Sequence, residues 1–272
     1  MLISNRARWG LRSVALLYLA LLLILPVVVM FVKTFDHGFA VAWGWMTTPA
    51  AISALWLSIL MAVVAVPLNM LFGIGTALIL VRRRGRLAAI LDALIDLPFL
   101  VSPIIVGLAL TLVYGIHGWF GTWFSDHGIQ IIFSPTGMVL ATVFVSLPFV
   151  VREVAPVLAE VGTEQEQAAA TLGASGWQTF WRITLPSIRW GVLYGVILST
   201  ARALGEIGAV LVVSSLVAGQ TLTLPLLVFE RDQQVGGSAT TSAYAAATEL
   251  AVISLVVLLV MTLLAPRRNT SA

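Results

Sequence analysis

The chain has 272 residues, of which 60% are hydrophobic, only 10% are charged and none is cysteine, and its formal net charge is +3. Soluble globular chains carry roughly 25% charged residues, so a chain this apolar is expected in lipid, not in water. The lack of cysteine excludes disulfides and thiolate metal sites. The arginines lie between apolar runs and not on one polar face, which argues against nucleic-acid binding.

Long apolar runs divide the chain into candidate membrane spans. A helix needs about 20 apolar residues to cross the hydrocarbon core. On this basis we expect an all-α membrane protein with a single transmembrane domain over residues 1–272 and six spans, near residues 12–35, 51–81, 90–115, 137–158, 188–214 and 242–265. The first run is longer than the roughly 7–15 residues of a signal-peptide core, so we read it as a span that is not cleaved.

The basic residues predict the orientation. Most of them fall before the first span, in the loop after the second, in the loop after the fourth, or after the sixth: Arg6, Arg8, Arg12, Arg82, Arg83, Arg84, Arg86, Arg182, Arg189, Arg267 and Arg268. Lys33 and Arg231 fall on the opposite side. Basic residues gather in cytoplasmic loops, so both termini are predicted to be cytoplasmic, as an even number of spans also requires. Six aromatic residues would then form a belt at the outer interface: Trp43, Trp45, Trp119, Phe120, Trp123 and Phe124.

The longest loop on the predicted cytoplasmic side, residues 163–186, is polar and reads TEQEQAAATLGASGWQTFWRITLP. Thr163 followed by Glu166 predicts a capping box at the start of a helix. Gly173 can end that helix in a left-handed conformation.

A second short helix is expected in the same loop. Ser175 and Gln178 repeat the capping pattern, and the helix should stop before Pro186 because proline disfavours helical geometry in the residue that precedes it. Helices this short are marginal alone in water. They therefore either need a partner surface or lie on the lipid as an interfacial element.

The spacing in this loop resembles the EAA loop of binding-protein-dependent ABC importer permeases, which reads E-A-A, three residues, Gly, nine residues, I-x-L-P. The matching positions are Gln167, Ala168, Ala169, Gly173, Ile183, Leu185 and Pro186. The family's leading Glu is Gln167 here, and Glu166 stands beside it. The resemblance implies the type I ABC importer (MetI-like) permease fold, with coupling helices in 163–186 that dock into a groove on a cytoplasmic ATPase.

Three further stretches, 92–110, 133–158 and 201–210, resemble sulfate/thiosulfate permeases of the CysW type. The last of them also resembles molybdate permeases, so a molybdate/tungstate importer is the alternative. The resemblance implies a multi-pass permease subunit of an ATP-driven sulfate/thiosulfate importer in the bacterial plasma (inner) membrane.

The same resemblance implies the partners. They are a CysT-like second permease that completes a heterodimer, two copies of a CysA-like ATPase, and a periplasmic or lipid-anchored sulfate-binding protein. No P-loop occurs in this sequence. ATP and Mg²⁺ are therefore expected on the ATPase, with no cofactor, metal or catalytic residue in this chain.

Charged residues within the expected spans are functional candidates because charge is costly in a membrane. Arg202 and Glu206 are four residues apart and share a helix face. They either line the translocation path or form a self-neutralising pair that fixes helix packing. Asp92 and Asp96 are expected to hold arginines of the inner loops or a gate hinge, and Asp96 and Pro103 complete the path candidates.

Two other classes of protein fit the sequence less well. A secondary transporter would need its own ion-coupling residues and usually internal repeats, and it would leave the capped loop unexplained. A membrane enzyme would need a nucleophile with its base, or metal ligands at membrane depth, and no such motif occurs in the sequence. The permease reading also predicts that a loaded receptor docks on the outer loops, including 215–241.

Overall fold

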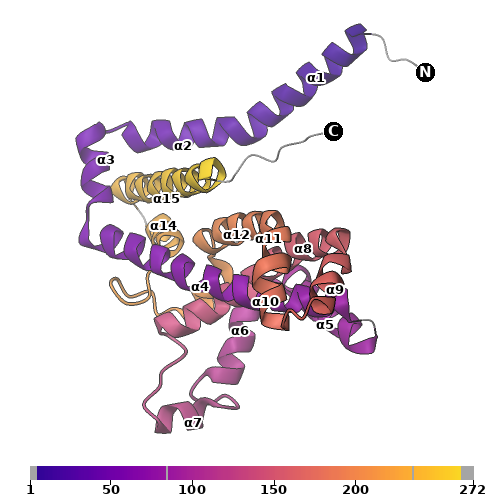
Figure 1. The fold of residues 1–272 in the computed structure, drawn as a ribbon. Coiled ribbons are helices and arrows are strands. Elements are labelled where there is room, and N and C mark those ends of the chain that lie inside the picture. The colour runs from indigo at the N-terminus through magenta and orange to yellow at the C-terminus, as the bar shows by residue number, and fades with distance from the viewer. Residues whose placement is uncertain (1–4, 84, 235, 265–272) are drawn as a thin grey trace.

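The computed structural model describes residues 5–83, 85–234 and 236–264, and all regular elements in these ranges are helical (Figure 1). In the first half they are α1 (Asn5–Leu19), the π-helical turn η1 (Ala20–Ile24), α2 (Leu25–Phe35), α3 (Phe39–Met46), α4 (Pro49–Arg82), α5 (Arg86–Leu100), α6 (Pro103–Tyr114) and α7 (Gly121–Asp126). In the second half they are α8 (Pro135–Val161), α9 (Glu164–Thr171), α10 (Gly176–Thr179), the π-helical turn η2 (Phe180–Thr184), α11 (Leu185–Ser187), α12 (Arg189–Leu204), α13 (Gly208–Val213), α14 (Leu224–Gln233) and α15 (Gly237–Leu264). Arg84, Arg267, Arg268 and the last residue of the sixth expected span, Ala265, lie outside the described residues.

Within the described residues, four continuous helical segments are long and apolar enough to cross a membrane: Leu11–Phe35, Pro49–Arg82, Pro135–Val161 and Ala239–Leu263. They coincide with the first, second, fourth and sixth expected spans. The fold is all-α, as expected, within the part of the chain that the structure describes.

The expected span 90–115 contains two helices. α5 and α6 pass the length and hydropathy test only together, and they are bent by 114° at the residues between them. Val101 and Ser102 take extended conformations there, and Pro103 starts α6. A residue before proline is driven out of the helical region, and proline fits the first position of a helix, so Pro103 accounts for the break.

The expected span 188–214 is also interrupted. α12 ends at Leu204, α13 begins at Gly208, and Glu206 lies in the break. α13 packs on α6, and a Cβ on Gly208 would lie 2.9 Å from Pro103 Cβ. The two broken spans therefore touch close to their breaks.

The packed centre of the molecule is formed by α4, α8 and α12. Gly195 of α12 lets that helix approach α8 closely, because a Cβ there would lie 2.9 Å from Val150 Cα. Asn69 of α4 joins all three helices: its side-chain amide donates to Ser146 Oγ on α8 at 2.7 Å and to Ser199 Oγ on α12 at 3.1 Å.

The amino-terminal helix lies at the edge of this core. α2 runs beside α15, and α1 continues beyond it, away from the rest of the fold (Figure 1). Thr34 fixes the contact, since its hydroxyl lies 2.7 Å from that of Thr248 on α15. The large apolar side chains of Leu11–Ile24 are exposed, as expected of a helix that faces lipid or another membrane chain.

Candidate functional site

The loop 163–186 folds as two short helical segments joined by a tight turn. α9 ends in a Schellman motif: the amide of Ala174 donates to Ala169 O at 3.0 Å, and that of Gly173 donates to Ala170 O at 3.0 Å. Gly173 has φ +86°, the left-handed conformation predicted for it.

The predicted capping box at Thr163 is wrong. The Thr163 hydroxyl makes no capping bond to the helix backbone; it accepts from Gln167 Nε2 at 2.9 Å. The carboxylate of Glu166, the other member of the expected box, bonds to Arg82 and Thr184 and not to the start of the helix. The second box is present: Gln178 N donates to Ser175 Oγ at 3.3 Å, and Ser175 N donates to Gln178 Oε1 at 2.9 Å.

The second helix does not stop before Pro186. Helical conformation continues from α10 through η2 and α11 to Ser187. In η2 the amide of Leu185 bonds to Phe180 O, one residue further back than in an α-helix. This wider turn makes room for Pro186, which lacks an amide hydrogen and would clash with the preceding turn of an α-helix.

An apolar patch on this loop has no cover from the described chain. It consists of Leu172, Trp177 and Trp181, which are 88%, 71% and 50% exposed, and we call it the loop patch. The two tryptophan rings contact each other edge to face with centroids 5.5 Å apart. Exposed aromatic anchors on a preformed turn are typical of protein-binding surfaces.

Glu166 is directed into the molecule and not toward the loop surface. Its Oε1 accepts from Arg82 Nη2, at the end of α4, at 2.7 Å, and from the Thr184 hydroxyl of η2 at 2.8 Å. Gln167 is exposed. The carboxylate beside the expected Glu position therefore fixes the loop to the membrane helices.

Arg202 and Glu206 form an ion pair at the end of α12. Glu206 is buried, and its second oxygen accepts from Ala209 N at 2.8 Å, which caps the start of α13. Glu206 thus neutralises Arg202 and stabilises the break in its span. This geometry favours the packing interpretation for Glu206, whereas the Arg202 side chain remains 28% exposed.

The carboxylates of α5 hold an arginine of α8, not one of the inner-loop arginines. Arg152 Nη2 lies 2.9 Å from Asp92 Oδ1 and 2.6 Å from Asp96 Oδ1, and its Nε donates to Asp96 at 3.0 Å. Of the path candidates, Pro103 packs against Gly208, at the end of the break that contains Glu206. Asp96 belongs to the separate cluster with Arg152.

The family model of the binding-protein-dependent transport system inner membrane component matches residues 69–270. The sulfate transport system permease protein CysW of Synechocystis sp. is 47% identical over 262 residues, covering 96% of this chain and 94% of that protein. CysW of Escherichia coli is 44% identical over 92% of this chain and 86% of its own length. This chain belongs to the CysW-type sulfate permease family. It is therefore a multi-pass inner-membrane permease component of an ABC transporter.

A second relative and two solved structures extend the comparison. The sulfate transport system permease protein CysT of Synechocystis sp. is 40% identical over 92% of this chain and 87% of its own length. The fold matches a bacterial ABC transporter for the acidic polysaccharide alginate, with a TM-score of 0.77 at 17% identity over 98% of both chains. The alginate transporter in complex with its pentasaccharide-bound periplasmic protein gives 0.78 at 16% identity, over 98% of this chain and 96% of that chain. At this identity the two structures bear on the fold alone.

The loop motif of this permease is split between its surface and its interior. Gln167, Ala168, Gly173 and Pro186 are exposed, and Ala169 is buried. Ile183 and Leu185 are half-buried, and Leu185 packs on the core of α4, α5 and α8. The inward-facing positions therefore hold the loop on the membrane helices, while the others are open to a partner.

Three polar groups important to the permease were not singled out from the sequence. Asn69 has one clear signal, an amide alone in a long apolar run. The sequence predicts Arg82 only as one of the basic residues of a loop. Arg231 was expected on the outer side, but it is buried, with Nη1 donating to Ser242 O at 3.1 Å and Nη2 donating to Thr48 Oγ1 at 3.0 Å.

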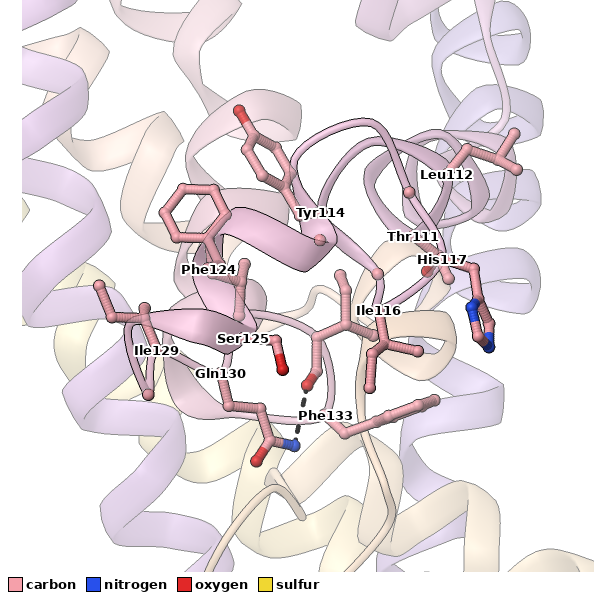
Figure 2. A pocket seen from close by; sticks show the side chains of 16 residues that line it. Thr111, Leu112, Tyr114, Ile116, His117, Phe124, Ser125, Ile129, Gln130 and Phe133 are labelled. Atoms are coloured by element: carbon pink, nitrogen blue, oxygen red, sulfur yellow. Dashed lines mark hydrogen bonds between the residues drawn. The ribbon is translucent and has the colours of Figure 1, made fainter.

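The end of α6 and the segment that follows it line an open cavity of about 690 Å³ (Figure 2). Tyr114 and Phe124 stand at one side of it, and Ile116 and Phe133 at the other. Gln130 Nε2 donates to Ile132 O at 3.1 Å within the segment that connects α7 to α8. Trp119 directly follows the cavity-lining residue Gly118 and is 85% exposed, as expected of a residue in the predicted interfacial belt.

Proposed function

We propose that this permease carries sulfate and thiosulfate into the cell as one half of the membrane path of an ATP-driven importer. The observation that carries the proposal is near-full-length identity of 44–48% to CysW sulfate permeases, together with a preformed apolar loop patch. The relatives give no support to the molybdate/tungstate alternative.

The second half of the path is a CysT-like permease. The 40% identity between this chain and CysT supports a pair of related subunits in a heterodimer. The solved complex of the alginate transporter with its periplasmic protein supports a periplasmic or lipid-anchored receptor, here one that binds sulfate. The receptor docks at the end of the molecule that carries 215–241.

Two CysA-like ATPase subunits bind ATP and Mg²⁺ and supply the energy for transport. Leu172, Trp177 and Trp181 enter a groove on the ATPase, and the exposed motif positions Gln167, Ala168, Gly173 and Pro186 border that contact. ATP binding closes the two ATPases, the loop transmits the movement, and the paired permeases open outward. Hydrolysis resets the gate, and sulfate leaves toward the cytoplasm, the side of both termini.

Within the path, Arg202 attracts the dianion and Glu206 limits how tightly it is held. Partial exposure of Arg202 beside a helix break supports this role. Pro103 sets the break that faces it, and Asp96 holds Arg152 so that the carboxylate does not repel sulfate.

Competition in uptake tests the substrate. Cells that depend on this chain take up labelled sulfate, and thiosulfate, selenate and molybdate are added as competitors. We expect thiosulfate to compete. Competition by molybdate alone at low concentration would show that the substrate assignment is wrong.

Co-purification tests the docking of the ATPase. Leu172→Asp places a charge in the centre of the loop patch and should reduce retention of the ATPase subunits by about tenfold or more, as expected for a buried apolar anchor. Gln165→Asp adds the same charge at an exposed position of α9 and should leave retention unchanged. Equal retention in the two variants would contradict docking through the patch.

A further inference from the structure

α4 spans the molecule from end to end. Its 34 residues give a length of about 51 Å at roughly 1.5 Å per residue, well beyond the ~30 Å of the hydrocarbon core. It starts beside α3 and α14, and its last residue, Arg82, bonds to Glu166 of α9 (Figure 1). Pro67 lies inside the helix without ending it. A displacement of one end of α4 therefore reaches the other.

One end of α4 is fastened to the loop 163–186 through a single carboxylate oxygen. Glu166 Oε1 accepts from Arg82 Nη2 at 2.7 Å and from Thr184 Oγ1 at 2.8 Å. The Arg82 and Glu166 side chains are 21% and 24% exposed, so water screens this pair less than a surface pair. Glu166 and Thr184 stand on either side of the turn at Gly173, so the two parts of the loop are joined to each other and, through Glu166, to α4.

The opposite end of α4 is fastened to α14 and α15. Thr48 caps α4 by accepting from Ala51 N at 3.3 Å, and the same hydroxyl accepts from the buried Arg231 Nη2 at 3.0 Å. Arg231 belongs to α14 and also bonds to Ser242 O on α15. Nearly three turns further along α4, Ser58 Oγ accepts from Leu224 N, the first residue of α14, at 2.8 Å.

We propose that α4 is the mechanical link between the two ends of the permease, with Arg82 and Thr48 as the positioning residues that fasten it. Docking of the loaded receptor near α14 shifts α4 through Thr48 and Ser58, and Arg82 passes the shift to the loop through Glu166. The same link carries the ATPase movement in the other direction. The inference rests on the proposed function, since it needs a receptor at one end and an ATPase at the other. It also gives the carboxylate at 166 a role inside the permease, while Gln167 bonds to Thr163 at the loop surface.

The test uses the full complex in proteoliposomes and measures how far sulfate-loaded receptor stimulates ATP hydrolysis. Arg82→Gln should keep the ATPases bound but reduce the stimulation by about fivefold or more, within the range of typical coupling energies. Arg83→Gln is the matched control, because Arg83 is exposed and its side chain bonds to nothing in the described part of the chain. Full stimulation with Arg82→Gln would overturn the proposal.

A charge exchange and a second pair of variants complete the test. Arg82→Glu combined with Glu166→Arg should recover stimulation that Arg82→Glu alone loses; no recovery would contradict the link. At the other end, Thr48→Val should lower stimulation. Thr47→Val should not, because among the described residues the Thr47 hydroxyl bonds only to carbonyls of α3. Equal effects of Thr48→Val and Thr47→Val on the stimulation of ATP hydrolysis would also contradict the proposed link through α4. A wild-type complex without receptor stimulation, or without bound ATPase, would instead overturn the proposed function.

Discussion

Single polar residues hold the membrane helices of this permease together. Asn69 is fully buried and connects α4 to α8 and α12 by two hydrogen bonds. Ser146 passes the connection on by donating to Thr142 O in its own helix. In a core built from alanine, valine and leucine, such bonds fix which faces of the helices meet.

Replacing Asn69 tests this role. Asn69→Val removes both donated bonds, and we expect a loss of about 1–2 kcal/mol in stability, seen as a lower midpoint of thermal unfolding in detergent. Thr76→Val, on the same helix, removes an exposed hydroxyl whose one hydrogen bond within the described part of the chain goes to Phe72 O. This control should leave the midpoint unchanged. If Asn69→Val unfolds at the same midpoint as the unsubstituted chain, Asn69 does not stabilise the packing of α4, α8 and α12.

Glu206 is expected to stabilise the break in its span as a cap. Glu206→Ala removes the acceptor for Ala209 N, whereas Glu206→Gln keeps an oxygen in that place. We expect Glu206→Ala to be less stable than Glu206→Gln by about 1 kcal/mol, the usual contribution of a helix cap. Chemical denaturation of the purified chain in micelles measures the difference, and two variants of equal stability would rule out capping.

At the scale of the element, the loop 163–186 depends on one backbone conformation. Gly173 closes the Schellman motif at φ +86°, and the left-handed region costs a residue with a Cβ roughly 1–2 kcal/mol, with β-branched residues worst. The turn places the loop patch, so its distortion displaces Leu172 and Trp177 together.

We therefore expect Gly173→Val to abolish sulfate uptake and to reduce ATPase binding by about tenfold, while the chain still inserts. Gly176→Ala is the control, because a Cβ there meets open space and the backbone needs no left-handed conformation. Normal uptake by Gly173→Val would show that the turn does not couple the permease to its motor.

The short elements also show where sequence reasoning was incomplete. The spacing of Ser175 and Gln178 predicted a capping box, and the structure contains it. The same rule failed at Thr163, because Arg82, distant in sequence, draws the Glu166 carboxylate away from the helix start. At Pro186 the helix continues past the proline because a π-helical turn precedes it, and no local sequence pattern predicts that turn.

At the scale of the whole molecule, the distribution of arginines predicts which side each loop faces. The chain has no cysteine, so single substitutions report exposure directly. In spheroplasts, Asp126→Cys in α7 should react with a membrane-impermeant maleimide. Gln165→Cys in α9 should react only after the membrane is opened. The reverse pattern would invert the predicted topology.

Composition and the spacing of apolar runs were enough to predict an all-helical membrane protein, and a fixed motif spacing was enough to predict the turn between two short helices in the loop 163–186, for which we propose the ATPase contact. These features depend on the solvent and on residues close together in sequence, so they can be read along the chain. The pairing of Asp92 and Asp96 with Arg152, and the contacts of Asn69, Arg82 and Arg231, were decided by the tertiary structure. Each joins helices far apart in sequence, and a polar group at membrane depth takes whichever partner packing brings within reach.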